Sequence, residues 1–151
     1  MKTYSDMTKK SKISEDVALA DLKKFLEKYK AKEMRRGQLK DDKIKDDYVD
    51  VLEAIQDGFM VFDDKHNPKY TLRVPLETDG GNPELATREI LFKTRVRPSV
   101  KADLMDGLKI ETQLGKFSIR YMGYIADLSA GDIDKLDPED YDVINQICSV
   151  F

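Results

Sequence analysis

The chain has 151 residues, of which 40% are hydrophobic and 36% charged, and its 26 Lys and Arg nearly balance its 29 Asp and Glu. That length suits one domain, because roughly 150 residues bury enough surface for one core but would leave two separate cores thin. A single histidine and a single cysteine exclude an internal disulfide and argue against a zinc site, which needs clustered Cys and His.

Residues 1–12 lack apolar periodicity, and we expect them to form a flexible tail. Residues 13–57 are predicted to form a pair of amphipathic helices. The first is capped by Ser14, carries an apolar stripe and ends at Gly37. The second starts near Asp41 and ends at Gly58. The two expected stripes contain Leu19, Leu22, Leu26 and Tyr29 in the first helix, and Ile44, Tyr48, Val51, Leu52 and Ile55 in the second.

The apolar period changes after Gly58. Residues 59–62 and 70–74 flank a turn rich in Asp, Asn and Pro, which predicts a β-hairpin. Residues 77–83 have the composition of a loop, and residues 90–97 are predicted to form a third strand that Pro98 ends. Lys93, Arg95 and Arg97 would share one face of that strand. We therefore expect a small antiparallel three-stranded meander.

The last third returns to a helical period. Ser99 is expected to cap a short helix that ends near Gly107, and a longer helix is expected over 113–128. A short turn follows at 129–132, and Asp137 with Pro138 predicts the start of the final helix. Together these elements predict an α+β fold: an N-terminal helical pair, the meander and a helical C-terminal third.

Catalytic and metal sites have little sequence support. A Ser-His-Asp or Cys-His site would need His66, which lies in the predicted hairpin turn, where a histidine is usually solvated. A calcium loop starting at Asp132 would put Leu136 and Val143 where oxygen ligands belong, so helix capping better explains the carboxylates of 132–137. We expect no enzymatic activity, no metal and no cofactor.

Charge is unevenly distributed, with a net +4 over residues 1–47 and −7 over residues 48–151. Such asymmetry allows two faces or two copies to attract each other, although solvated helix faces are the favoured explanation. Nucleic-acid binding is not favoured, because the chain as a whole is acidic. No apolar run reaches membrane-spanning length and the lysine-rich start does not resemble a secretory signal, so we expect a cytoplasmic protein without membrane contact.

The final helix carries an apolar stripe towards the end of the given sequence. Such a surface is either covered by the protein's own core or binds a partner. We expect Ile144 to belong to the core and assign Ile147, Cys148 and Phe151 as candidate partner-binding residues, although a cysteine at such a position also suits a small buried hydrophobe. The basic pair Arg95 and Arg97 is the next candidate.

Several short motifs resemble one known family. Residues 94–104 (TRVRPSVKADL) are followed by 125–129 (IADLS), by 133–141 (IDKLDPEDY) and by a closing segment at 144–151, and residues 70–76 (YTLRVPL) precede them. This order resembles the Mu-type tail assembly chaperones of contractile-tailed phages and prophages. The resemblance covers roughly residues 58–151 as a tail-assembly-chaperone-like α+β domain, and the helical extension at 13–57 has no counterpart in it.

The resemblance implies a non-enzymatic protein of the bacterial host cytoplasm that acts in virion assembly. It would bind the tape-measure protein and tail tube components through protein–protein interaction, and it could form a homo-oligomer. A structural virion connector or tail-completion protein would share the fold class, and a small DNA-binding regulator would instead use the basic N-terminal helices.

Overall fold

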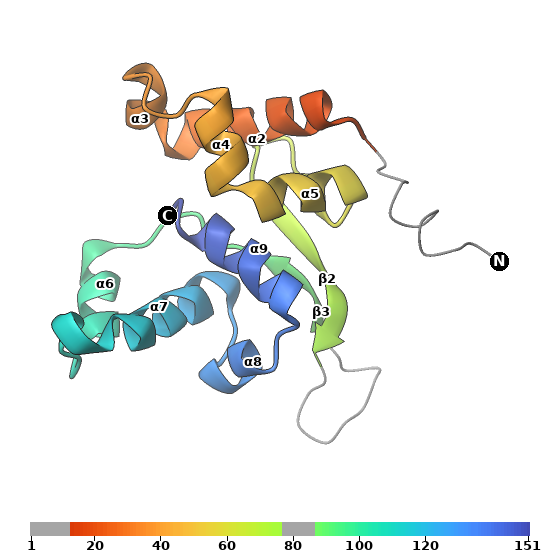
Figure 1. Cartoon of the computed structure of the whole chain (residues 1–151). Helices are drawn as coiled ribbons and strands as arrows, with labels where there is room; N and C mark the ends of the chain where they lie inside the picture. Colours follow the sequence, from red (N-terminus) through yellow and green to blue (C-terminus); the bar gives the residue numbers. More distant parts are fainter. Residues whose placement is uncertain (1–12, 77–86) are drawn as a thin grey trace. The chain divides into compact units, whose positions relative to one another are not determined.

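The computed structural model describes residues 13–76 and 87–151 (Figure 1). Helices precede and follow a three-stranded antiparallel sheet of order β1-β2-β3, so the predicted α+β class is confirmed. The tail expected at 1–12 and the loop expected at 77–83 lie outside the described residues. Among the described helices, none is both long enough and apolar enough to cross a membrane.

The chain divides between Tyr70 and Thr71 into two compact units. This division falls inside strand β2 (Pro68–Leu76), whereas the family resemblance sets its boundary between residues 57 and 58. The division at Tyr70 separates two compact parts of the structure. The boundary at residues 57 and 58 marks where the resemblance to the family begins, and it stays a prediction.

The helical pair expected at 13–57 is broken into four helices within the described residues. These are α2 (Glu15–Tyr29), α3 (Ala31–Arg35), α4 (Asp41–Asp47) and α5 (Val49–Asp57). The breaks lie at Lys30 (φ −123°, ψ 36°) and Tyr48 (φ −122°, ψ 33°). At Tyr48 the N–H still donates to the Ile44 carbonyl at 3.0 Å, so the chain changes direction while keeping this hydrogen bond. The apolar stripe continues through the break, and the sequence pattern therefore gave no sign of it.

The expected ends of this region are confirmed. The Ser14 side chain accepts a hydrogen bond from the Val17 N–H at 3.3 Å and caps α2. Gly37 (φ 67°) and Gly58 (φ 84°) adopt the left-handed backbone that glycine tolerates, just beyond α3 and at the end of α5. The core of this unit forms where α2 packs against α5. Its buried side chains include Leu19, Leu22, Phe25, Leu26, Ile44, Tyr48, Val51, Leu52 and Ile55.

The predicted hairpin is also confirmed. Strand β1 (Met60–Phe62) pairs antiparallel with β2, and Met60 lies opposite Tyr70. In the turn, the Asp63 carboxylate accepts from the backbone N–H groups of Lys65 at 2.8 Å and Asn67 at 2.9 Å. His66 lies in this turn with a φ of 62°, as its position between two strands predicted.

The third strand differs from the prediction. Strand β3 spans Thr87–Leu91, and residues 92–97 have no regular secondary structure. The Lys93 N–H donates to the carbonyl of Ile125 at 2.9 Å, near the end of helix α7 (Ile110–Ala126), rather than to a strand. Lys93, Arg95 and Arg97 are all exposed, whereas Phe92, Thr94 and Val96 between them are more buried. The predicted alternation of exposed and buried side chains is therefore present, but the three basic residues do not share a strand face.

Four helices follow β3 within the described residues: α6 (Pro98–Met105), α7 (Ile110–Ala126), α8 (Ala130–Asp134) and α9 (Pro138–Cys148). Ser99 does not cap α6, because the helix already begins at Pro98, with Arg97 in the capping position. Helix α7 is displaced from the expected 113–128. It begins earlier, is kinked at Gln113 (φ −127°, ψ 27°) and ends where Asp127 turns left-handed at φ 58°.

Candidate functional site

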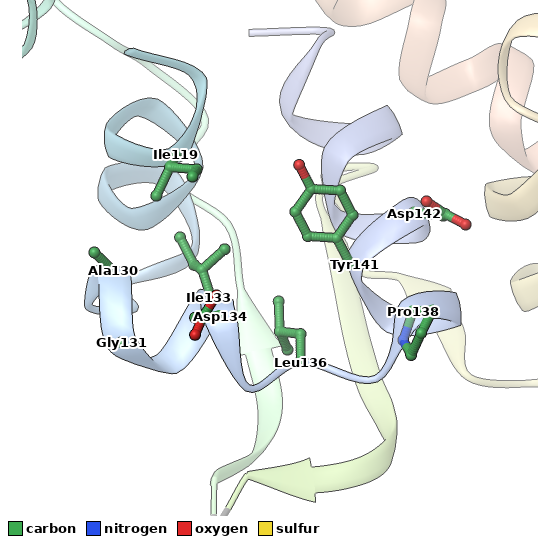
Figure 2. A pocket seen from close by; sticks show the side chains of 9 residues that line it. All are labelled: Ile119, Ala130, Gly131, Ile133, Asp134, Leu136, Pro138, Tyr141 and Asp142. Atoms are coloured by element: carbon green, nitrogen blue, oxygen red, sulfur yellow. The ribbon is translucent and has the colours of Figure 1, made fainter. Parts of the chain in front are cut away.

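A groove lies in the C-terminal unit between α7, α8 and α9 (Figure 2). Its volume is about 640 Å³. The residues that line it are Ile119 on α7, Ala130, Gly131, Ile133 and Asp134 on α8, Leu136 in the connection, and Pro138, Tyr141 and Asp142 on α9.

The floor of the groove is apolar. Ile133 and Leu136 are only 4% and 8% exposed, and in Figure 2 their side chains lie between α7 and the Tyr141 ring. Ile119 is 36% exposed on the opposite wall, and Tyr141 is half-buried. An apolar side chain entering from a partner would therefore lose water against a preformed surface, which favours binding.

The charged residues of the groove are all acidic. Asp134 and Asp142 are exposed, and the lining contains no Lys, Arg or His. Within residues 13–76 and 87–151, neither carboxylate takes part in an ion pair. The groove thus combines an apolar floor with two carboxylates that form no ion pair among the described residues.

A tight turn places α8 beside the end of α7. The Leu128 N–H donates to the Gly123 carbonyl at 2.9 Å, and a Cβ at Gly123 would lie 2.6 Å from the Leu128 carbonyl oxygen. Ser129 then starts α8 with a reciprocal capping box. Its hydroxyl accepts from the Asp132 N–H at 3.0 Å, and the Asp132 carboxylate accepts from the Ser129 N–H at 3.1 Å. Because Gly123 has no side chain, this close return is possible.

Helix α9 begins as the sequence predicted. The Asp137 carboxylate accepts from the Glu139 N–H at 3.2 Å, and Pro138 occupies the first turn. The capping roles expected for the carboxylates of this segment are therefore confirmed at Asp132 and Asp137. Among the residues that the structure describes, no three His, Cys, Asp or Glu side chains are grouped so that they could hold a metal ion.

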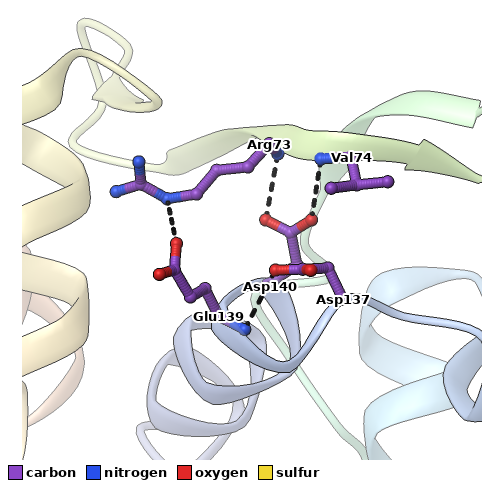
Figure 3. Close-up of polar contacts among 5 residues, drawn as sticks. All are labelled: Arg73, Val74, Asp137, Glu139 and Asp140. Atoms are coloured by element: carbon purple, nitrogen blue, oxygen red, sulfur yellow. Dashed lines mark hydrogen bonds and ion pairs between the residues drawn. The ribbon is translucent and has the colours of Figure 1, made fainter. Parts of the chain in front are cut away.

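A buried carboxylate connects α9 to strand β2 (Figure 3). Asp140 is 0% exposed and accepts from the backbone N–H groups of Arg73 at 3.0 Å and Val74 at 3.1 Å. The Arg73 Nε lies 3.5 Å from a carboxylate oxygen of Glu139. Buried charges need such donors to offset lost hydration, and these contacts fix one wall of the groove.

The partner-binding residues expected from the sequence lie elsewhere. Ile147 and Cys148 are buried at 0% and 2% exposure, and burial raises the pKa of the Cys148 thiol to about 12. Phe151 is half-buried just beyond α9, and Arg95 and Arg97 are exposed in the irregular segment before α6. None of these five lines the groove, and their partner-binding role stays a prediction. Ile144 is fully buried, so its expected place in a core is confirmed.

The sequence reasoning missed the groove residues. Helix capping was expected of the carboxylates of 132–137, but Asp134 lines the groove and caps neither α8 nor α9. Ile119 and Asp142 were given no role in the sequence analysis. The available signal was the motif at 133–141, in which Ile133, Leu136 and Tyr141 follow one another across a helix start.

A smaller hollow of about 160 Å³ lies beside the groove's supporting helices, with Tyr121 and Cys148 among its lining residues. The Tyr121 hydroxyl is buried and has no hydrogen-bond partner among the described residues. Burial also raises the pKa of this hydroxyl above its usual range. A donor without a partner is a poor starting point for catalysis, and this site is interpreted as imperfect packing.

Comparison with protein-family models, curated proteins and solved structures found no match to this chain. The family resemblance therefore rests on the sequence motifs alone, at 70–76, 94–104, 125–129, 133–141 and 144–151. Chemically, the groove can bind an apolar segment and favour positive charge around it.

Proposed function

We propose that this protein is a non-enzymatic tail assembly chaperone of a contractile-tailed phage or prophage. It binds the tape-measure protein in the host cytoplasm and assists assembly of the tail tube. One observation carries the proposal: the motif at 133–141, on which the family resemblance rests, also supplies Ile133, Leu136 and Tyr141 to the apolar groove.

The proposed mechanism is protection by reversible binding. In the family that the motifs resemble, the client is a long, largely helical protein with apolar seams that the tube later encloses. Many copies of a small chaperone cover these seams, and tube subunits displace them as they polymerise. Such exchange needs modest affinity per copy and no nucleotide.

Co-purification with a phage tape-measure protein tests the proposal. The wild-type protein should co-purify with a tape-measure fragment. Ile119→Lys places a charge on the groove wall and should abolish capture without lowering the melting temperature, because Ile119 is already 36% exposed. Leu114→Lys is the matched control, since Leu114 is 59% exposed on the same helix and does not line the groove.

A third variant separates the groove from the site expected in the sequence analysis. Phe151→Asp should retain capture if the groove binds the client, and should lose it if the client binds at the C-terminal residues. Stoichiometric recovery of the protein in purified tail particles would contradict the chaperone proposal and favour a structural connector. A salt-dependent DNA mobility shift would favour a regulator.

A further inference from the structure

We infer that the groove between α7, α8 and α9 binds one face of a basic amphipathic helix, with aliphatic side chains against Ile133 and Leu136 and Lys or Arg beside Asp134 and Asp142. The inference rests on the proposed function only in taking the tape-measure protein as the source of that helix. The groove itself defines the chemistry of its occupant.

The apolar half of the inference follows from the floor and walls. Ile133 and Leu136 form a floor that is nearly closed to water, and the exposed Ile119 extends the apolar surface up the α7 wall. A helix presents aliphatic residues at spacings of three and four, which suits a groove walled by two other helices. Each aliphatic side chain that is fully buried there would favour binding.

The charged half follows from the carboxylates that the fold leaves unused. Residues 121–151 contain seven acidic residues and one lysine. Asp132 and Asp137 cap helices and Asp140 accepts backbone N–H groups, so these three have structural roles. Asp134 and Asp142 lie at the groove and take part in no ion pair within the described part of the chain. A cationic partner would complement them, and an anionic partner would be repelled.

The charges should act mainly on selectivity. Ion pairs at a solvated rim contribute about 0.2–1 kcal/mol each, so they add little to total affinity but steer the approach of a partner and disfavour the wrong sign. We therefore expect the preference for a basic helix to weaken as the salt concentration rises, while the apolar contribution persists.

Two synthetic helical peptides test the inference. Both carry leucine at positions i, i+3, i+4 and i+7, and their remaining charged positions are all lysine in one peptide and all glutamate in the other. Fluorescence anisotropy at low salt should show the lysine peptide binding about tenfold tighter, or about 1.4 kcal/mol. Amide chemical-shift changes on binding should cluster at Ile119, Ile133 and Tyr141.

Matched variants separate the two contributions. The double variant Asp134→Asn/Asp142→Asn should remove most of the charge preference but keep leucine-dependent binding. The control Asp103→Asn/Glu111→Gln makes the same change in charge at exposed carboxylates outside the groove and should behave like wild type. Ile119→Lys should abolish binding of both peptides.

Equal affinity for the two peptides, or shift changes that cluster away from the groove, would overturn the inference. Failure of the inference is distinguishable from failure of the proposed function. If the protein does not prefer the lysine peptide but still captures the tape-measure fragment, and Ile119→Lys abolishes that capture, the chaperone function stands and the helix chemistry is wrong. If the lysine peptide binds as expected but the tape-measure fragment does not, the proposed client is wrong.

Discussion

Replacing Asp140 with asparagine tests how helix α9 is held to strand β2. The carboxylate is completely buried and its two oxygens accept separate N–H groups from Arg73 and Val74. An asparagine side chain has nearly the same shape but offers one acceptor oxygen, and its amide group is a donor. One backbone N–H would then face another donor in a buried site.

The expected cost follows from these two contacts. A hydrogen bond to a charged group contributes about 1.5–3 kcal/mol, and a buried donor left without a partner costs about 1–3 kcal/mol. The penalty for burying the carboxylate is relieved at the same time, which offsets part of the loss. We therefore expect Asp140→Asn to lower the free energy of unfolding by about 2–4 kcal/mol, a large fraction of a typical ~5–15 kcal/mol.

Urea titration followed by far-ultraviolet circular dichroism measures this loss. Glu139→Ala is the control, because it removes only the ion pair between Glu139 and Arg73, and the Glu139 side chain is 74% exposed. Exposed pairs contribute less than about 1 kcal/mol, so this variant should stay close to wild type. If Asp140→Asn were as stable as Glu139→Ala, the two backbone contacts would not hold α9 as argued.

Three further predictions concern single groups. Gly123→Ala should destabilise the protein by about 1–3 kcal/mol in thermal unfolding, because the added Cβ would lie 2.6 Å from a backbone oxygen. The control Gly115→Ala should be neutral or stabilise by up to about 1 kcal/mol, because its added Cβ would meet nothing within 4 Å beyond the adjoining helix backbone. Equal effects of the two variants would refute the close approach at Gly123. Tyr121→Phe should be neutral or stabilising by calorimetry, because the hydroxyl is buried without a partner in the described structure; a loss above about 1 kcal/mol would reveal a hydrogen bond. The pKa of Asp63 lies below its usual 3.8 because the backbone N–H groups of Asn67 and then Lys65 donate to the carboxylate. Its contribution to stability is therefore present above the unfolded value and lost as the pH falls through the lower folded value, and a carboxyl titration by NMR with a midpoint at or above 3.8 would contradict this.

Local chemistry made much of the fold predictable. Ser14, Asp137 and Gly58 act within a few residues of their own positions, so a cap or a left-handed turn follows directly from residue type. The hairpin likewise follows from alternating apolar residues around a turn-forming segment.

The features that sequence reasoning missed depend on contacts between distant residues. The breaks at Lys30 and Tyr48 leave the apolar spacing unchanged, and residues 92–97 alternate in burial like a strand while Lys93 bonds to Ile125 instead. The groove was missed for a similar reason. Ile119 becomes important only because the turn at Gly123 returns the chain and places α8 beside α7.

The buried thiol of Cys148 provides an intrinsic probe of how often α9 leaves its place. It is the chain's one cysteine, it is 2% exposed, and burial raises its pKa to about 12. An exposed thiolate attacks alkylating reagents, so modification must await an opening of the helix. When reclosing is fast, the labelling rate reports the equilibrium population of the open state. Each molecule can be modified only once and at a known residue, so mass spectrometry of the intact chain reads out the dynamics of α9 without an engineered label.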